Sequence, residues 1–215
     1  MRPEGRGEEA RQGMKVRSSA VRPWSRRIKR GVDLVLSAVG LVVAAPICLV
    51  LALVIRLESR GPAIFRQDRA GKDGKGFTLY KFRTMIDRAP DGFVSANDPR
   101  VTRFGRVLRM ISLDEIPQLW NVVKGEMSLV GPRPDRVFRA ETYDDRVRAR
   151  LSVRPGVMGW AQLHDGRSMT WEERYEYDLE YVKDWSLGLD FRIMWWSVAR
   201  GKMLQREGGL RDGKA

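Results

Sequence analysis

The longest apolar segment of the chain lies near its N-terminal end, where residues 34–55 read LVLSAVGLVVAAPICLVLALVI without a charged side chain. This run of about 22 residues would form a helix of roughly 33 Å, close to the hydrocarbon thickness of a bilayer. It is too long for a secretory signal, and no small-residue cleavage site follows it. The pattern therefore predicts one membrane helix over residues 29–58.

Pro46 lies near the middle of this segment, directly after Ala45. A proline inside a helix removes one backbone hydrogen bond and bends the helix. Basic residues flank the segment on both sides, whereas a spanning helix usually carries its positive charge on one side. These are Arg26, Arg27, Lys29 and Arg30 before the segment and Arg56, Arg60, Arg66 and Arg69 after it. Two interpretations stay open: a spanning helix with a tolerated proline, and a re-entrant helix that bends at Pro46.

Beyond the apolar segment, shorter patterns predict a small α+β domain that is mainly helical. Residues 63–67 and 77–82 predict two short strands, which the glycine-rich turn AGKDGKG would join as a β-hairpin. This turn lacks the spacing of a phosphate-binding P-loop. Helical patterns follow at 103–109, 117–124, 137–151, 171–184 and 189–203, with a loop at 129–135 and an irregular segment or short strand at 153–162.

The last helical segment, 189–203, is amphipathic and places tryptophans beside arginine and lysine. This composition suits a helix that lies in the membrane interface, and a core helix is the alternative. The pattern as a whole divides the chain into a basic flexible arm (1–28), a membrane helix (29–58), a main domain (59–203) and a flexible tail (204–215).

Composition narrows the classes of function. The chain has 215 residues and a formal net charge of +13, which indicates an anionic partner such as nucleic acid, a membrane surface or a phosphorylated substrate. Its single cysteine, Cys48, excludes a disulfide scaffold and a cysteine-based zinc site, and its single histidine, His164, excludes a histidine-rich metal centre.

The segment SLDEIPQLWN, residues 112–121, contains two adjacent carboxylates, Asp114 and Glu115. In one interpretation, Ser112 and Glu115 form a capping box at the start of a helix. In the other, the pair is catalytic: the helix N-terminus keeps Asp114 ionised as a nucleophile and suits a nearby phosphate or Mg²⁺-bound phosphate. Spacing alone does not decide between them.

Several basic residues stand in constrained settings and are candidates for contacts with phosphate. Arg133 lies between two prolines, which restrict its backbone and preorganise a bidentate contact with a phosphate. The others are Lys81 and Arg83 in YKFRTM, Arg109 before the acidic pair, and Arg154 before Pro155. Each could also be an ordinary surface charge.

Five segments together resemble the bacterial sugar transferases known as monotopic phosphoglycosyl transferases. They are KRGVDLVLS (29–37), FRQDRAGKDGKGFTLYKFRTM (65–85), DPRVTRFGRVLRMISLDEIPQLWNVVKGEMSLVGPRPD (98–135), VRPGVMGWAQ (153–162) and YDLEYVKDWSLGLDFRIM (177–194). They occur in the family's order and cover nearly everything outside the two ends. Ala45-Pro46 stands where some members have Ser-Pro at the re-entrant bend.

The resemblance implies an enzyme that moves a sugar-1-phosphate from a nucleotide diphosphate sugar, a UDP-sugar by analogy, to a polyprenyl phosphate and releases UMP. It implies that Asp114 attacks phosphorus and forms a covalent intermediate, and that Glu115 binds Mg²⁺. Arg109, Arg133, Arg154 and Lys81 would hold phosphate oxygens, and Arg83 and Asp178 are possible substrate-binding residues. The resemblance also implies that the membrane helix (29–58) is re-entrant and that residues 59–203 form the catalytic domain, with the site on the cytoplasmic face of a bacterial inner membrane.

A membrane-anchored protein that binds nucleic acid is the alternative from another class, and net charge favours it. No helix-turn-helix, RNA-binding or OB signature supports it, so no nucleic-acid partner is expected. An inactive scaffold of the same family is a third hypothesis, against which the intact Asp114-Glu115 pair argues.

Overall fold

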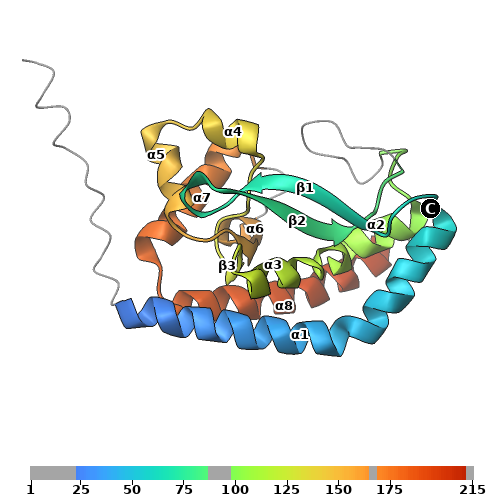
Figure 1. Ribbon diagram of the computed structural model, residues 1–215. Coiled ribbons are helices and arrows are strands. Elements are labelled where there is room, and N and C mark those ends of the chain that lie inside the picture. Colours follow the sequence, from blue (N-terminus) through green and yellow to red (C-terminus); the bar gives the residue numbers. More distant parts are fainter. Residues whose placement is uncertain (1–22, 87–97, 165–168, 212–215) are drawn as a thin grey trace, which may run out of the picture.

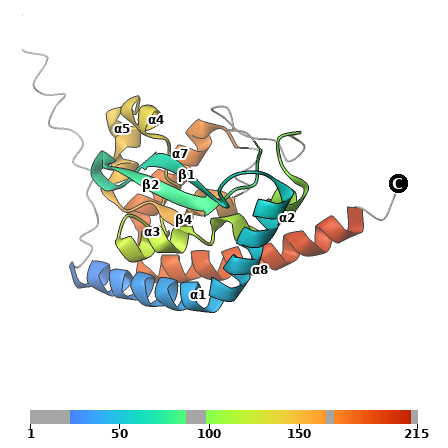
Figure 2. The same ribbon diagram turned by 45° about the vertical axis from the view of Figure 1, so that its right-hand side comes forward.

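Helix α1 (Pro23–Glu58), with 36 residues, is the longest element of the fold. The computed structural model describes residues 23–86, 98–164 and 169–211, with side chains up to residue 199. The helix is long and apolar enough to cross a membrane. Figures 1 and 2 show it running beneath the rest of the domain and then turning upward along one side. Pro46 lies within the helix, where its ring and missing N–H favour a bend.

Three polar residues attach the N-terminal half of α1 to the domain. Arg30 donates through Nη1 to the carbonyl oxygen of Val122 at 2.6 Å, and Lys29 Nζ bonds to Asp190 Oδ2 at 2.7 Å. The buried carboxylate of Asp33 accepts from Ser128 Oγ at 2.7 Å. These bonds hold one face of the helix against the domain, because a charged side chain that is covered by the fold needs a polar partner there.

The opposite face of α1 is apolar and exposed. Val42, Leu49 and Leu57 are 75%, 73% and 78% exposed, and many other apolar side chains of the helix are exposed as well. After the bend, Leu51 and Ile55 pack against Phe82 and Leu108 to form a small core. A soluble domain seldom leaves so large an apolar surface in water, so this face needs an apolar partner.

The predicted β-hairpin is confirmed, with longer strands than expected. Strands β1 (Ile64–Ala70) and β2 (Gly76–Phe82) pair antiparallel, with Ile64 opposite Phe82 and Ala70 opposite Gly76. The turn η2 (Lys72–Gly74) needs positive φ at Asp73 (56°) and Gly74 (76°), which aspartate and glycine adopt more readily than most residues. The hairpin lies across the helices in Figure 1.

The remaining elements are short up to residue 170 and long after it. They are α2 (Arg103–Met110), η3 (Leu113–Glu115), α3 (Gln118–Lys124), β3 (Ser128–Val130), α4 (Val137–Glu141), α5 (Asp145–Arg148), η4 (Ala149–Ser152), β4 (Gly156–Met158), α6 (Trp160–Leu163), α7 (Trp171–Asp184) and α8 (Leu187–Arg211). The α+β, mainly helical class is thus confirmed. Helix α8 runs beside α1 in both views, and the main core forms where β2, α3, β3, α7 and α8 meet.

The structure differs from the sequence prediction in several places. The predicted helix 137–151 is broken into three pieces, because Asp144 accepts from Val147 N at 2.7 Å and starts a new helix after Thr142. Strand β4 agrees with one of the two alternatives for 153–162, but β3, which overlaps the predicted loop 129–135, and its parallel pairing with β4 were not predicted. Residues 23–28 and 204–211, predicted as part of the arm and the tail, continue α1 and α8.

Candidate active site

Asp114 and Glu115 lie in the one-turn segment η3, between α2 and α3. Ser112 precedes it in the left-handed conformation (φ 57°, ψ 22°), and its side chain makes no capping hydrogen bond. The capping-box interpretation is therefore wrong. Helix α3 starts only at Gln118, after Pro117, so the carboxylates lie before α3, in the first turn of η3. The left-handed serine is a strained backbone conformation of the kind that often occurs at functional sites.

Glu115 forms an ion pair with Arg133 across the site. Arg133 donates through both of its Nη atoms to the two carboxylate oxygens, with a distance of 3.4 Å from Nη1 to Oε2. The nearby Glu115 carboxylate raises the pKa of Arg133 above its ordinary value. The Arg133 side chain is 45% exposed, so a phosphorylated ligand can reach its guanidinium group.

Asp114 is buried, with 7% of its surface exposed. Burial, followed by the neighbouring charge of Glu115, raises its pKa from 3.8 to about 6, although Lys81, Arg133 and Arg109 favour its ionised form. The helix N-terminus was expected to keep this carboxyl ionised. In the structure, three cationic side chains from β2, α2 and the loop after β3 lie near Asp114 and favour its ionised form.

Lys81 and Arg109 complete this group of charges. Burial lowers the pKa of Lys81 to about 8; Asp114 opposes that shift, while Arg133 and Arg109 add to it. Arg109 donates through Nε to Thr84 Oγ1 at 2.8 Å, and burial lowers its pKa while Asp114 raises it. Helix α2 can lie this close to Thr84 because residue 105 is glycine: a β-carbon there would be 2.4 Å from the Thr84 carbonyl oxygen.

Three other predicted residues have different partners. Arg83 binds the C-terminal end of α1, donating to the carbonyl oxygens of Ser59 at 2.6 Å and Arg60 at 3.0 Å. Arg154 donates through Nε to the carbonyl oxygen of Gly125 at 2.8 Å. Asp178 is buried in an ion pair with Arg150. The structure thus brings Lys81, Arg109 and Arg133 to the acidic pair and gives Arg83, Arg154 and Asp178 contacts elsewhere in the fold.

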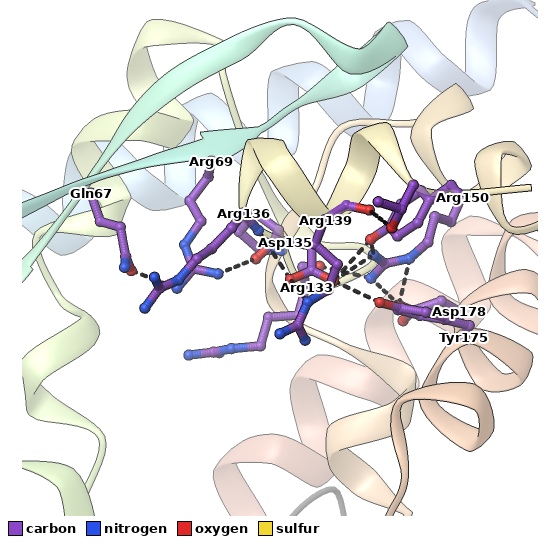
Figure 3. A network of polar contacts seen from close by, with 12 residues as sticks. Gln67, Arg69, Arg133, Asp135, Arg136, Arg139, Arg150, Tyr175 and Asp178 are labelled. Atoms are coloured by element: carbon purple, nitrogen blue, oxygen red, sulfur yellow. Dashed lines mark hydrogen bonds and ion pairs between the residues drawn. The ribbon is translucent and has the colours of Figure 1, made fainter. Parts of the chain in front are cut away.

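Sequence analysis missed Arg69, Asp135 and Arg150, which form a buried polar network next to Arg133 (Figure 3). Asp178, the partner of Arg150, was the one residue of this network named as a candidate, although Arg69 and Asp135 lie within segments that carry the family resemblance. Arg69 was noted only as a basic residue flanking the membrane helix. No local pattern marks Arg150, which contacts residues far away in the sequence.

Comparison with known proteins is consistent with this geometry. The family model for bacterial sugar transferases matches residues 24–203. The chain belongs to the bacterial sugar transferase family. A "UDP-glucose:undecaprenyl-phosphate glucose-1-phosphate transferase" of Escherichia coli (strain K12) is 43% identical over 188 residues, which cover 82% of this chain and 40% of that protein. The chain therefore spans about two fifths of that relative's length.

Two further relatives show the range of the family. The "Uncharacterized sugar transferase EpsL" of Bacillus subtilis (strain 168) is 42% identical over 84% of this chain and 89% of that protein. A "UDP-N-acetylgalactosamine-undecaprenyl-phosphate N-acetylgalactosaminephosphotransferase" of Aeromonas hydrophila is 38% identical over 80% of this chain and 43% of that protein. Relatives named for different sugars are thus similar to this sugar transferase to almost the same degree.

Proposed function

We propose that this bacterial sugar transferase moves a sugar-1-phosphate from a nucleotide diphosphate sugar to undecaprenyl phosphate and releases UMP when the donor is a UDP-sugar. The observation that carries the proposal is the group formed by Asp114, Glu115, Lys81, Arg109 and Arg133. Two carboxylates lie near three cationic side chains. The cations can stabilise negative phosphoryl oxygens, which suits a reaction between two phosphorylated substrates. The names of the Escherichia coli and Aeromonas hydrophila relatives support the substrate class.

In the proposed mechanism, an oxygen of the Asp114 carboxylate attacks the sugar-bearing phosphorus of the donor. The bond between this phosphorus and the bridging oxygen breaks, and UMP leaves with the bond's electron pair. An oxygen of undecaprenyl phosphate then attacks the same phosphorus and regenerates the Asp114 carboxylate. Lys81, Arg109 and Arg133 stabilise the negative charge on the phosphoryl oxygens in both steps.

The two carboxylates also fit Mg²⁺. Among the described residues, no group of three or more histidine, cysteine or acidic side chains could hold a metal by itself. Mg²⁺ commonly binds one or two carboxylates and completes its shell with substrate phosphates and water. Glu115 would hold the ion in place of its ion pair with Arg133, which would leave Arg133 for the phosphate, and Asp114 would lie beside the ion. When bound, Mg²⁺ neutralises charge on the donor diphosphate.

The exposed apolar face of α1 supports membrane attachment, and we propose that α1 is re-entrant. Its bend, its interior proline and the basic residues on both flanks suit a helix that enters and leaves by one face. Phe191, Trp195 and Trp196 of α8 are 65%, 66% and 54% exposed and suit the interfacial region. This arrangement would place the site at the cytoplasmic face of the inner membrane, where a soluble donor can meet a lipid acceptor.

The direct test is a panel of UDP-sugars with undecaprenyl phosphate and Mg²⁺, using the purified chain in detergent and measuring released UMP. Multiple turnovers of UMP release that depend on one sugar and on the lipid are the expected result, with Asp114→Asn as the inactive control. No release with any sugar would contradict the proposed function. Steeply salt-dependent binding to DNA instead would support the nucleic-acid alternative.

The raised pKa of Asp114 predicts how the first step depends on pH. With a pKa of about 6, the carboxylate is mostly ionised at pH 7 and becomes protonated as the pH falls below 6. The single-turnover rate of UMP release from donor alone should therefore be constant above about pH 7 and fall about tenfold per pH unit below pH 6. A rate that stays constant down to pH 4.5 would contradict ionised Asp114 as the nucleophile.

Topology gives a further prediction. In a Cys48→Ala background, Ala20→Cys and Lys72→Cys place thiols on opposite flanks of α1. A membrane-impermeant thiol reagent should label neither in intact spheroplasts and both after lysis. Labelling of only one flank in intact spheroplasts would mean that α1 spans the membrane. Pro46→Leu restores the backbone N–H at the bend, so it should shift the protein towards this one-flank pattern and lower activity.

A further inference from the structure

The loop that carries Arg133, residues 132–135, is held through each of its carbonyl groups. Prolines at 132 and 134 have no N–H, so the loop depends on its carbonyl oxygens for attachment. Four donors from three parts of the chain bind them: Gly156 N to Pro132 at 2.9 Å, Arg150 Nη2 to Arg133 at 2.8 Å, and, from the end of β1, Arg69 Nη1 to Pro134 at 3.0 Å and Ala70 N to Asp135 at 2.8 Å. The backbone of Arg133 therefore has little freedom to move.

Arg150 is the donor that binds the Arg133 carbonyl directly, and it is one of the most buried charges in the described structure. Its side chain is 4% exposed, and that of its partner Asp178 is 3% exposed. Arg150 Nε donates to Asp178 Oδ2 at 3.0 Å, and Nη1 donates to the hydroxyl of Tyr143. Figure 3 shows this guanidinium group between Asp178 and the loop.

Asp135 fixes the other end of the loop from inside the domain. Its Oδ2 accepts from the hydroxyl groups of Tyr143 at 2.9 Å and Tyr175 at 2.8 Å. Just before the loop the backbones are also packed closely, because a β-carbon on Gly156 would lie 2.1 Å from Gly131 N.

A buried ion pair contributes little net stability, because removing both charges from water costs about as much as the pair regains. The Arg150–Asp178 pair is therefore better explained by the geometry that it imposes on the loop than by stability.

We propose that Arg150 and Asp178 are positioning residues for Arg133. Asp178 orients the guanidinium group of Arg150, Arg150 binds the carbonyl oxygen of Arg133, and the fixed backbone directs the Arg133 side chain towards Glu115. Neither residue touches substrate. This inference rests on the proposed function, in which Arg133 stabilises charge on a phosphoryl group. It replaces the expectation that Asp178 binds substrate itself.

The inference predicts that loss of Arg150 or Asp178 matters only while Arg133 is present. Arg150→Lys keeps a charge next to Asp178 but lacks the fork that reaches both Asp178 and the Arg133 carbonyl. It should lower kcat about ten- to a hundred-fold, as expected for a misplaced catalytic group, with little change in KM for the donor. In an Arg133→Ala background, the same change should lower the residual activity less than twofold.

A double-mutant cycle measures this coupling, with UMP release normalised to the folded fraction from thermal melts and size-exclusion chromatography. Asp178→Asn provides a second variant if Arg150→Lys folds poorly. The matched control is Asp190→Asn, which removes an equally buried carboxylate that binds Tyr181 and Lys29 rather than the loop. Its effect should be the same in both backgrounds.

Equal losses from Arg150→Lys with and without Arg133 would overturn the positioning role. A raised donor KM with unchanged kcat in Asp178→Asn would also overturn it, because that result indicates direct substrate binding. Both outcomes differ from a failure of the proposed function, in which the wild-type protein itself would release no UMP.

Discussion

Asp114→Asn should abolish the covalent adduct and turnover, and it should also stabilise the protein. The amide keeps the size of the side chain but cannot attack phosphorus as an anion, so neither step of the proposed mechanism can proceed. The stability effect follows from burial, which raises the pKa of Asp114 from 3.8 to about 6 in the folded state. Above pH 6 the folded protein holds an ionised carboxylate that costs about 3 kcal/mol.

The sign of this effect changes with pH in a defined way. Well below pH 3.8 the carboxyl group is protonated in both the folded and unfolded states, so the variant gains nothing. As the pH rises from about 4 to 6, the wild-type protein loses stability relative to Asp114→Asn. Above pH 6 the difference in the free energy of unfolding is constant. Thermal or denaturant unfolding at pH 4, 6 and 8 measures it. A variant less stable than wild type at pH 8 would contradict the pKa shift.

Intact-mass measurement after incubation with donor and Mg²⁺, without lipid, tests the chemistry. Wild type should gain the mass of one sugar phosphate, and Asp114→Asn should gain none. Glu115→Gln is the comparison variant: it keeps the nucleophile but weakens the proposed metal site, so its residual activity should rise with added Mg²⁺. Wild-type protein that turns over without any adduct would favour direct attack by undecaprenyl phosphate.

Arg133→Lys should lower activity about ten- to a hundred-fold although the charge is kept, because one charge-assisted contact of about 1.5–3 kcal/mol is lost. The guanidinium group contacts both carboxylate oxygens of Glu115, and a single ammonium group cannot reproduce this planar contact. The same geometry suits two oxygens of one phosphate. The loss should appear in kcat/KM for the donor.

Arg146→Lys is the matched control for this prediction. Arg146 forms an ion pair with Glu176 in which both side chains are more than half exposed, and such pairs contribute little. Activity of this variant should stay within twofold of wild type. Should Arg133→Lys also match wild type, Arg133 would be no more than a surface charge, and the cationic side of the proposed site would lose its central residue.

Local sequence patterns were sufficient to predict the elements that are stabilised by contacts between residues close in sequence. The run 34–55, uncharged over its whole length, predicted α1, and the turn AGKDGKG predicted the hairpin of β1 and β2. Both features arise from contacts within a few residues: helix periodicity in the first case and the positive φ angles of Asp73 and Gly74 in the second.

Elements that depend on distant partners were not predicted. Strands β3 and β4 have three residues each and pair across some 25 residues of chain, so the local pattern indicated only an irregular segment or short strand around β4 and neither β3 nor the pairing. The division of 137–151 also escaped prediction. Its helical composition continues across Asp144, and only the capping bond from Val147 N shows that a new helix starts there.

The sequence by itself determined the acidic pair, the apolar helix with its interior proline, and the family to which they belong. Only the tertiary structure decided which basic residues meet the pair. Arg83, Arg109, Arg133 and Arg154 carry the same charge and all lie in distinctive local sequence, yet Arg83 and Arg154 bind carbonyl groups at the ends of α1 and α3. An arginine's partner depends on the packing of distant segments, as with Arg150 and Asp178, 28 residues apart. The raised pKa of Asp114 has the same origin, because burial is a property of the folded chain.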